Sequence, residues 1–234
     1  MKLCLAAIAA AALAVFGACS SQTAGVLRQN GSADMELRAS LEPRMAELIR
    51  SLSGNFGGSS AENSLDGPAI AESMQTAPGV SAVSFHNINP TTIEGSLSIT
   101  KVEDFLRLTS LPEASRLIRV QGRLLSIRLD LDTGPELLGA LSPDVADYLS
   151  AIMAPVSTGE RLGSGEYLEL VTSVYGTAIS REIAAARIRA VIEVPGEITR
   201  VEGGAFSGRE ARFDIPLLEL LVLERPILYE IEWR

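Results

Sequence analysis

Cysteine and histidine are nearly missing from this chain, and their scarcity excludes several kinds of site. The 234 residues include two cysteines, Cys4 and Cys19, and one histidine, His86. A protein zinc site takes three or four ligands from cysteine, histidine and acidic side chains, and a disulfide needs two thiols in one folded domain. Cys4 lies in the apolar run that begins the chain. We therefore expect no disulfide, no metal and no cofactor.

Positive charge and aromatic side chains are also scarce. The chain has 20 Lys and Arg against 29 Asp and Glu, which gives a formal net charge of −9 at pH 7. Proteins bind nucleic acid by neutralising phosphates with Lys and Arg, and polybasic segments bind anionic lipid surfaces. The acidic balance argues against both modes, so no nucleic-acid partner is expected. Aromatic residues make up 5% of the chain and hydrophobic residues 47%, which predicts an aliphatic core.

One long apolar run is present, at the start of the chain. Lys2 precedes an uncharged segment from Leu3 to Phe16, and Gly17 and Ala18 then lead to Cys19. A positive start, an apolar run too short for a retained membrane span and small residues at its end are typical of a secretory signal. The four residues Phe16-Gly17-Ala18-Cys19 resemble the lipobox of bacterial lipoproteins.

This resemblance implies removal of residues 1–18 and attachment of diacylglycerol and fatty acid, such as palmitate, to Cys19. The acyl chains would then anchor the protein in the bacterial cell envelope, on the periplasmic side or in the outer membrane. There are two alternatives. The segment could be an ordinary cleaved signal whose cysteine is incidental, or it could be an anchor helix that is retained. Residues 19–32 are small and polar, which indicates a flexible tether, so deleting residues 20–30 should not affect stability. Residues 33–234 are expected to form a single domain.

Hydrophobic periodicity predicts a mixture of strands and helices in that domain. Apolar residues recur at every second position from 33 to 41, 187 to 194 and 227 to 233, as in strands with one buried face. The last of these should bury Ile227, Tyr229, Ile231 and Trp233. The expected strands are 33–41, 80–87, 91–100, 117–120, 123–131, 187–194, 198–201, 211–215 and 227–233. The expected helices are 43–53, 68–75, 102–108, 133–152 and 164–175, with a buried turn at 217–223.

Short turns between neighbouring strands favour antiparallel pairing. The sequence therefore predicts an α+β fold with a mainly antiparallel, curved sheet of seven to nine strands and helices packed on one face. Such a sheet can enclose an apolar cavity with polar groups at its mouth. A solid core without a cavity is the alternative.

Candidates for catalysis are few. His86 is the sole imidazole, and no Gly-x-Ser-x-Gly elbow surrounds any serine. Gly163-Ser164-Gly165 resembles a nucleophile turn, but it is also the start of a predicted helix. Asp130 and Asp132 lack the glycine and the distal glutamate of a calcium-binding loop.

Acidic and glycine-rich segments give no stronger signal. Glu94, Glu103 and Glu166 are not distinguished from solvated acids, although glycosidase carboxylates can lie far apart in sequence. Gly203-Gly204 to Gly208 lacks the lysine and the helix of a phosphate-binding loop. We therefore expect no enzyme activity and no catalytic residue.

A second resemblance concerns the C-terminal part of the chain. The stretch from Val194-Pro195-Gly196-Glu197-Ile198 through Gly203 to Ile231-Glu232-Trp233 is similar to the corresponding part of the mycobacterial LppM-like lipoproteins. This resemblance implies an α+β domain that binds lipid-like molecules, and it assigns no individual binding residue. The hypothesis is a lipid-anchored envelope lipoprotein that binds a lipid-like ligand without catalysis. A scaffold that holds another envelope protein, or a hydrolase of envelope polymers, are the alternatives.

Overall fold

The alternating segments are strands in the computed structural model, which describes residues 20–55, 65–77, 79–102, 118–132 and 149–234. The strands that the sequence predicted are β2 (Ala33–Ser40), β3 (Val80–Asn89), β4 (Thr92–Ile99), β5 (Ile118–Gln121), β6 (Leu124–Leu129), β7 (Arg187–Glu193), β8 (Ile198–Glu202), β10 (Glu210–Pro216) and β11 (Ile227–Trp233). Two further strands, β1 (Ser20–Leu27) and β9 (Ala205–Ser207), were not predicted. With the helices described below, these strands confirm the α+β class.

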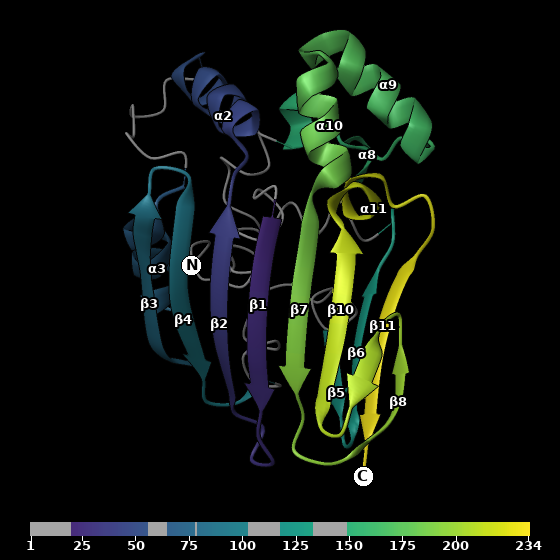
Figure 1. The fold of residues 1–234 in the computed structure, drawn as a ribbon. Helices are drawn as coiled ribbons and strands as arrows, with labels where there is room; N and C mark the ends of the chain where they lie inside the picture. The colour runs from purple at the N-terminus through teal and green to yellow at the C-terminus, as the bar shows by residue number, and fades with distance from the viewer. Residues whose placement is uncertain (1–19, 56–64, 78, 103–117, 133–148) are drawn as a thin grey trace.

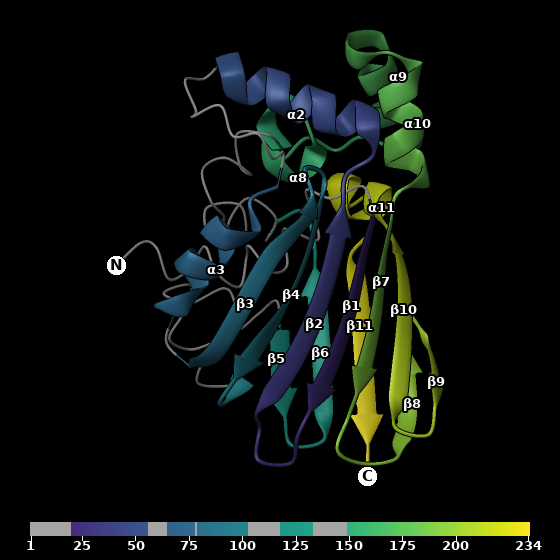
Figure 2. The same cartoon turned by 60° about the vertical axis from the view of Figure 1, so that its left-hand side comes forward.

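The strands form two sheets rather than one. A seven-stranded sheet has the order β3-β4-β2-β1-β7-β10-β9, and a four-stranded sheet has the order β5-β6-β11-β8. Figure 2 shows the smaller sheet facing the larger one. Pairing between the described strands is antiparallel, as predicted, except between β1 and β7, which run parallel.

The expected tether is wrong, because residues 20–27 form a central strand. β1 pairs with β2 from Ser20 to Leu27 and with β7 from Ser20 to Val26. Its residues are mostly small and polar, so they show no apolar alternation, and its stability comes from backbone hydrogen bonds on both sides. The folded domain therefore includes residues 20–32.

The described helices are α2 (Pro43–Asn55), α3 (Gly67–Gln75), α8 (Pro155–Thr158), α9 (Ser164–Tyr175), α10 (Thr177–Ala185) and α11 (Leu217–Val222). α3 lies beside β3, whereas α2, α8, α9, α10 and α11 gather at one end of the strands (Figure 1). We call this end the helical end. The sequence analysis predicted helices on one face of the sheet, and most of them lie at one end of the strands instead. The reason is that β2, β7 and β10 are all connected to their neighbouring helices at this end.

Three details of the helices bear on the sequence predictions. α10 was not predicted; Gly176, with φ of 87°, separates it from α9. The expected helix at 102–108 and most of the one at 133–152 lie outside the described residues. Within the described ranges, no helix is both long and apolar enough to cross a bilayer.

Two apolar clusters fill the interior. The larger one joins the helices to both sheets, and Tyr167, Met45 and Ile183 are among its buried members. The smaller one lies between the two sheets and includes Leu27, Leu125, Phe213, Ile231 and Trp233. Ile227, Ile231 and Trp233 are 9%, 1% and 7% exposed, and Tyr229 is half-buried. The predicted burial of the final strand is therefore confirmed.

Candidate functional site

A pocket opens at the end of the strands opposite the helical end, and we call it the distal pocket. Its volume is about 650 Å³. Four segments that are distant in sequence surround it: the β1–β2 turn, Gly122 and Arg123 between β5 and β6, Pro195 and Gly196 between β7 and β8, and the end of β11. Lys101 and Val102, which follow β4, complete the lining.

Backbone hydrogen bonds hold these segments together. The Arg28 N–H donates to the Ser32 carbonyl at 2.9 Å, and the Val102 N–H donates to the Gly31 carbonyl at 2.9 Å. The Trp233 N–H donates to the Arg123 carbonyl at 3.1 Å, which ties the final strand to the β5–β6 turn. The rim of the pocket is therefore built by paired main chain.

The interior side of the pocket is apolar. Leu27 and Trp233 are each 7% exposed and belong to the cluster between the sheets, and Val102 and Val120 are partly buried beside it. Gly196 allows the main chain to approach the end of β11, since a Cβ atom there would lie 2.0 Å from the Arg234 carbonyl oxygen and 2.9 Å from Trp233 Cδ1. A larger residue at 196 would displace the main chain of Arg234 and, with it, Trp233.

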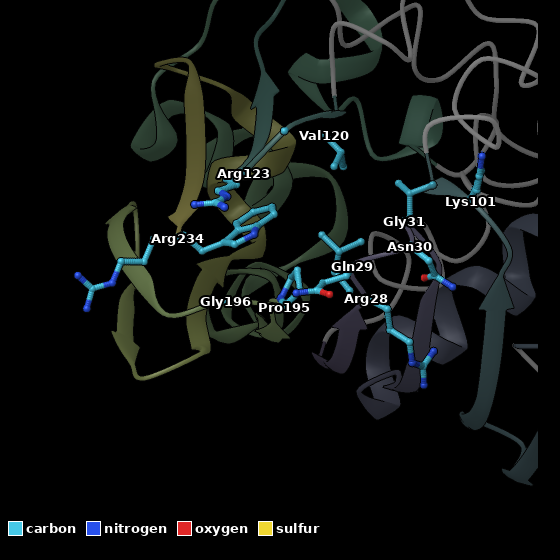
Figure 3. A pocket seen from close by; sticks show the side chains of 14 residues that line it. Arg28, Gln29, Asn30, Gly31, Lys101, Val120, Arg123, Pro195, Gly196 and Arg234 are labelled. Carbon is cyan, nitrogen blue, oxygen red and sulfur yellow. The ribbon is translucent and has the colours of Figure 1, made fainter.

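The rim of the pocket is positively charged although the chain as a whole is acidic. Arg28, Lys101, Arg123 and Arg234 line it, and no carboxylate is among the lining residues in the part of the chain that the structure describes. Arg123 and Arg234 lie on one side and Lys101 and Arg28 on the other, with apolar and uncharged residues between them (Figure 3). A site of this composition attracts anions.

Two of these four cations are already paired. Arg28 forms an ion pair with Asp34, and Arg234 forms one with Glu197, whose Oε2 accepts from Arg234 Nε at 3.1 Å. A hydrogen bond from Ser98 and the Arg28 guanidinium together hold the pKa of Asp34 below its ordinary value. Within the described residues, the side chains of Lys101 and Arg123 form no ion pair, so both can contact a ligand.

A second pocket, of about 450 Å³, lies at the helical end and is acidic. Asp130, Asp132, Glu166 and Glu224 line it together with Arg161. Glu166 accepts from the Gly163 N–H at 2.8 Å, and Glu224 accepts from the N–H and the hydroxyl of Ser164, both at 3.1 Å. These two carboxylates therefore hold the start of α9.

The second pocket thus brings together four residues that the sequence analysis considered, Asp130, Asp132, Gly163 and Glu166, whereas His86 and Glu94 lie elsewhere. Ser164 donates to Glu224, whereas His86 is exposed on β3 opposite the equally exposed Glu94 of β4. Among the described residues, no group of three or more His, Cys, Asp or Glu side chains could hold a metal ion. Cys19 and Glu103 lie outside the described residues.

The Gly203-Gly204 segment has a packing role. It forms the turn between β8 and β9. A Cβ at 203 would lie 2.5 Å from Tyr229 Cδ1, and one at 204 would lie 2.5 Å from the Arg212 carbonyl oxygen. Glycine is present because β10 and β11 come close to this turn.

The cationic rim was missed by the sequence analysis. Its members come from turns and strand ends near residues 28, 101, 123 and 234, and each is an ordinary exposed cation in its own segment. The available signal was that Lys101, Arg123 and Arg234 lie at the ends of predicted strands, whereas Arg28 lies in the segment predicted to be a tether. The order and direction of the strands in the two sheets determine which strand ends lie together, and the sequence pattern does not contain this information.

Comparison with known proteins gives one weak likeness. No protein-family model matches the chain, and no curated protein matches it. Among solved structures, the NMR structure of the folded domain of the Mycobacterium tuberculosis LppM protein is similar, with 12% sequence identity and a TM-score of 0.42. The match covers 92% of this chain and 88% of that one.

Proposed function

We propose that this protein is an envelope lipoprotein, anchored through acylated Cys19, whose domain binds an anionic amphiphile in the distal pocket without catalysis. The observation that carries the ligand class is the combination of a cationic rim and an apolar interior. An amphiphile with an anionic headgroup matches both parts. Lys101 and Arg123 would contact the headgroup, and Leu27, Val120 and Trp233 would contact the first part of its apolar chain.

The charges of the pocket suit a phosphate or carboxylate headgroup. Arginine presents a planar set of donors that can hold phosphate or carboxylate oxygens in pairs, and lysine adds a mobile point charge. The rim is positive although the chain as a whole has a formal net charge of −9. A zwitterionic amphiphile of the same chain length gains less from this positive rim.

Trp233 provides the measurement, because it is the single tryptophan of the chain and lines the pocket. Short-chain phosphatidylglycerol, kept monomeric, should change the tryptophan emission, and short-chain phosphatidylcholine should bind more weakly. The double variant Lys101→Gln and Arg123→Gln should lower the affinity for phosphatidylglycerol about tenfold, since two partly exposed charge contacts together contribute about 1.4 kcal/mol. Raising the salt concentration should reduce the difference between the two lipids.

The matched control removes the same charge elsewhere. Arg38→Gln and Arg181→Gln change two exposed cations on β2 and α10, outside the pocket. This double variant should bind phosphatidylglycerol like the wild type. Equal losses in both double variants would show that net charge, and not the pocket, determines binding. No change in emission with either lipid would refute the ligand class.

The anchor is tested separately. Cys19→Ser removes the thiol that would carry the diacylglycerol, so the protein should move from the membrane fraction to the soluble fraction of the envelope. The wild type should incorporate labelled palmitate and the variant should not. A variant that still fractionates with membranes, beside a wild type without label, would contradict lipidation.

A further inference from the structure

β1 begins immediately after the cysteine that would carry the lipid. Ser20 pairs with Ser40 of β2 and with Arg187 of β7, and Ser21 is 2% exposed. A strand held on both sides cannot be drawn out of the sheet without breaking two ladders of hydrogen bonds. An acyl group on Cys19 would therefore be attached to the rigid part of the domain, with no linker between them.

The start of β1 lies at the helical end of the fold. At this end β2 is followed by α2, α10 precedes β7, and the Leu217 N–H at the start of α11 donates to the Ala186 carbonyl at 3.1 Å. The opposite end of β1 is Leu27, which lines the distal pocket. The seven steps from Ser20 to Leu27, at about 3.3 Å each, separate the two ends by about 23 Å.

We propose that the domain is seated on the anchoring membrane by its helical end, so that the distal pocket opens away from that membrane. The proposal rests on the proposed lipidation of Cys19. An acylated residue that directly precedes a fixed strand allows little rotation of the domain, because a linker of several residues would be needed to bring the pocket to the same bilayer.

Each end of the fold has an exposed apolar side chain, Val174 at the helical end and Phe206 of β9 at the other. Val174 is 52% exposed and lies in the last turn of α9, next to the corner at Gly176. Figure 1 shows this corner at the far side of the helices from the strands. A bilayer interface would cover Val174, whereas the cationic rim would remain in water.

The orientation limits where the ligand comes from. A pocket about 23 Å from the anchored end cannot take an amphiphile directly from the leaflet that holds the anchor. It can receive one from a facing membrane or from a soluble carrier. The partner that this orientation favours is therefore a facing anionic lipid surface, on the far side of the domain.

The test uses the full chain, acylated in a bacterial host and reconstituted into vesicles of phosphatidylcholine and phosphatidylglycerol. With Cys4 removed and Cys19 acylated, an introduced cysteine is the sole free thiol. Thr177→Cys places a fluorophore at the corner between α9 and α10, and Ser207→Cys places one beside the β9–β10 turn at the other end; both positions are exposed. Phosphatidylcholine with a nitroxide on its headgroup serves as the quencher.

The label at 177 should lose most of its emission when the vesicles contain the quencher, and the label at 207 should lose little. Inserting about ten Gly and Ser residues after Cys19, with a mean reach of about 17 Å, should reduce the difference between the two sites. Equal quenching at both sites, or stronger quenching at 207, in a chain shown by mass spectrometry to be acylated overturns this orientation alone. A chain without an acyl group overturns both the orientation and the proposed anchor.

Discussion

Deleting residues 20–27 is expected to abolish cooperative folding of the domain. The deletion removes β1 and leaves β2 and β7 without their common neighbour, so the seven-stranded sheet divides into β3-β4-β2 and β7-β10-β9. Each backbone hydrogen bond contributes about 1 kcal/mol net. Losing two ladders is comparable with the whole stability of a domain, which is about 5–15 kcal/mol.

A point variant isolates the ladders from the loss of side chains. Ala24 is exposed, and it pairs with Glu36 of β2 and Val191 of β7. Ala24→Pro removes an N–H and fixes φ in the middle of a central strand, where proline is not tolerated. The carbonyl that loses its partner alone costs about 1–3 kcal/mol. Ala24→Ser changes the side chain and keeps the N–H, so it serves as the matched control.

Circular dichroism during heating and in urea measures both effects. A chain that starts at Ser20 should unfold cooperatively, and so should Ala24→Ser. The deletion should show no cooperative transition, and Ala24→Pro should unfold at clearly lower urea. If the chain without residues 20–27 unfolds at the same temperature as the chain that starts at Ser20, β1 is not part of the sheet.

β1 also shows which part of the fold the sequence could not predict. Strands such as β2 and β11 bury apolar side chains on one face, and the resulting alternation identifies them. β1 reads Ser-Ser-Gln-Thr-Ala-Gly before Val26, and within the described residues its Ser21 and Thr23 hydroxyls are buried without a hydrogen-bond partner. Pairing through the backbone leaves no alternation of apolar residues in the sequence. The small, polar composition of this segment therefore predicted a tether where the structure has a strand.

The same limit applies to the distal pocket. Periodicity identified β6, β7, β8 and β11, but it does not say which strand ends lie together. The parallel pairing of β1 with β7 brings Arg28 to the same end as Pro195 and Trp233. The cationic rim thus depends on pairings between residues far apart in sequence, which periodicity does not contain.

Trp233→Ala is expected to lower the stability of the domain strongly. Among the aromatic residues at strand ends, its truncation to alanine should cause the largest loss. Trp233 is 7% exposed and belongs to the same buried cluster as Leu27, Val194 and Phe213. Truncation of a buried aromatic residue to alanine typically costs about 3–5 kcal/mol. For a domain of this size, the loss corresponds to a Tm about 10 °C lower.

Phe206→Ala is the matched control. Phe206 lies in β9 and is 47% exposed, so its truncation removes an aromatic ring without opening a cavity in the core. It should therefore lower the Tm by no more than a few degrees. Trp233→Phe should lie between the two alanine variants, because it restores part of the buried area.

Deletion of residues 226–234 extends the same argument from a side chain to a strand. β11 is internal to the four-stranded sheet, where it pairs with both β6 and β8, and its last residues close the distal pocket. The deleted chain should therefore not fold, and it should show no cooperative unfolding transition. Trp233→Ala should still fold and unfold cooperatively, but with a lower Tm and a weaker affinity for the anionic amphiphile. A Tm for Trp233→Ala equal to that for Phe206→Ala would mean that the final strand does not close the core. Because binding and stability share this one side chain, the charge variants at 101 and 123, which leave the core intact, are needed to separate the two effects.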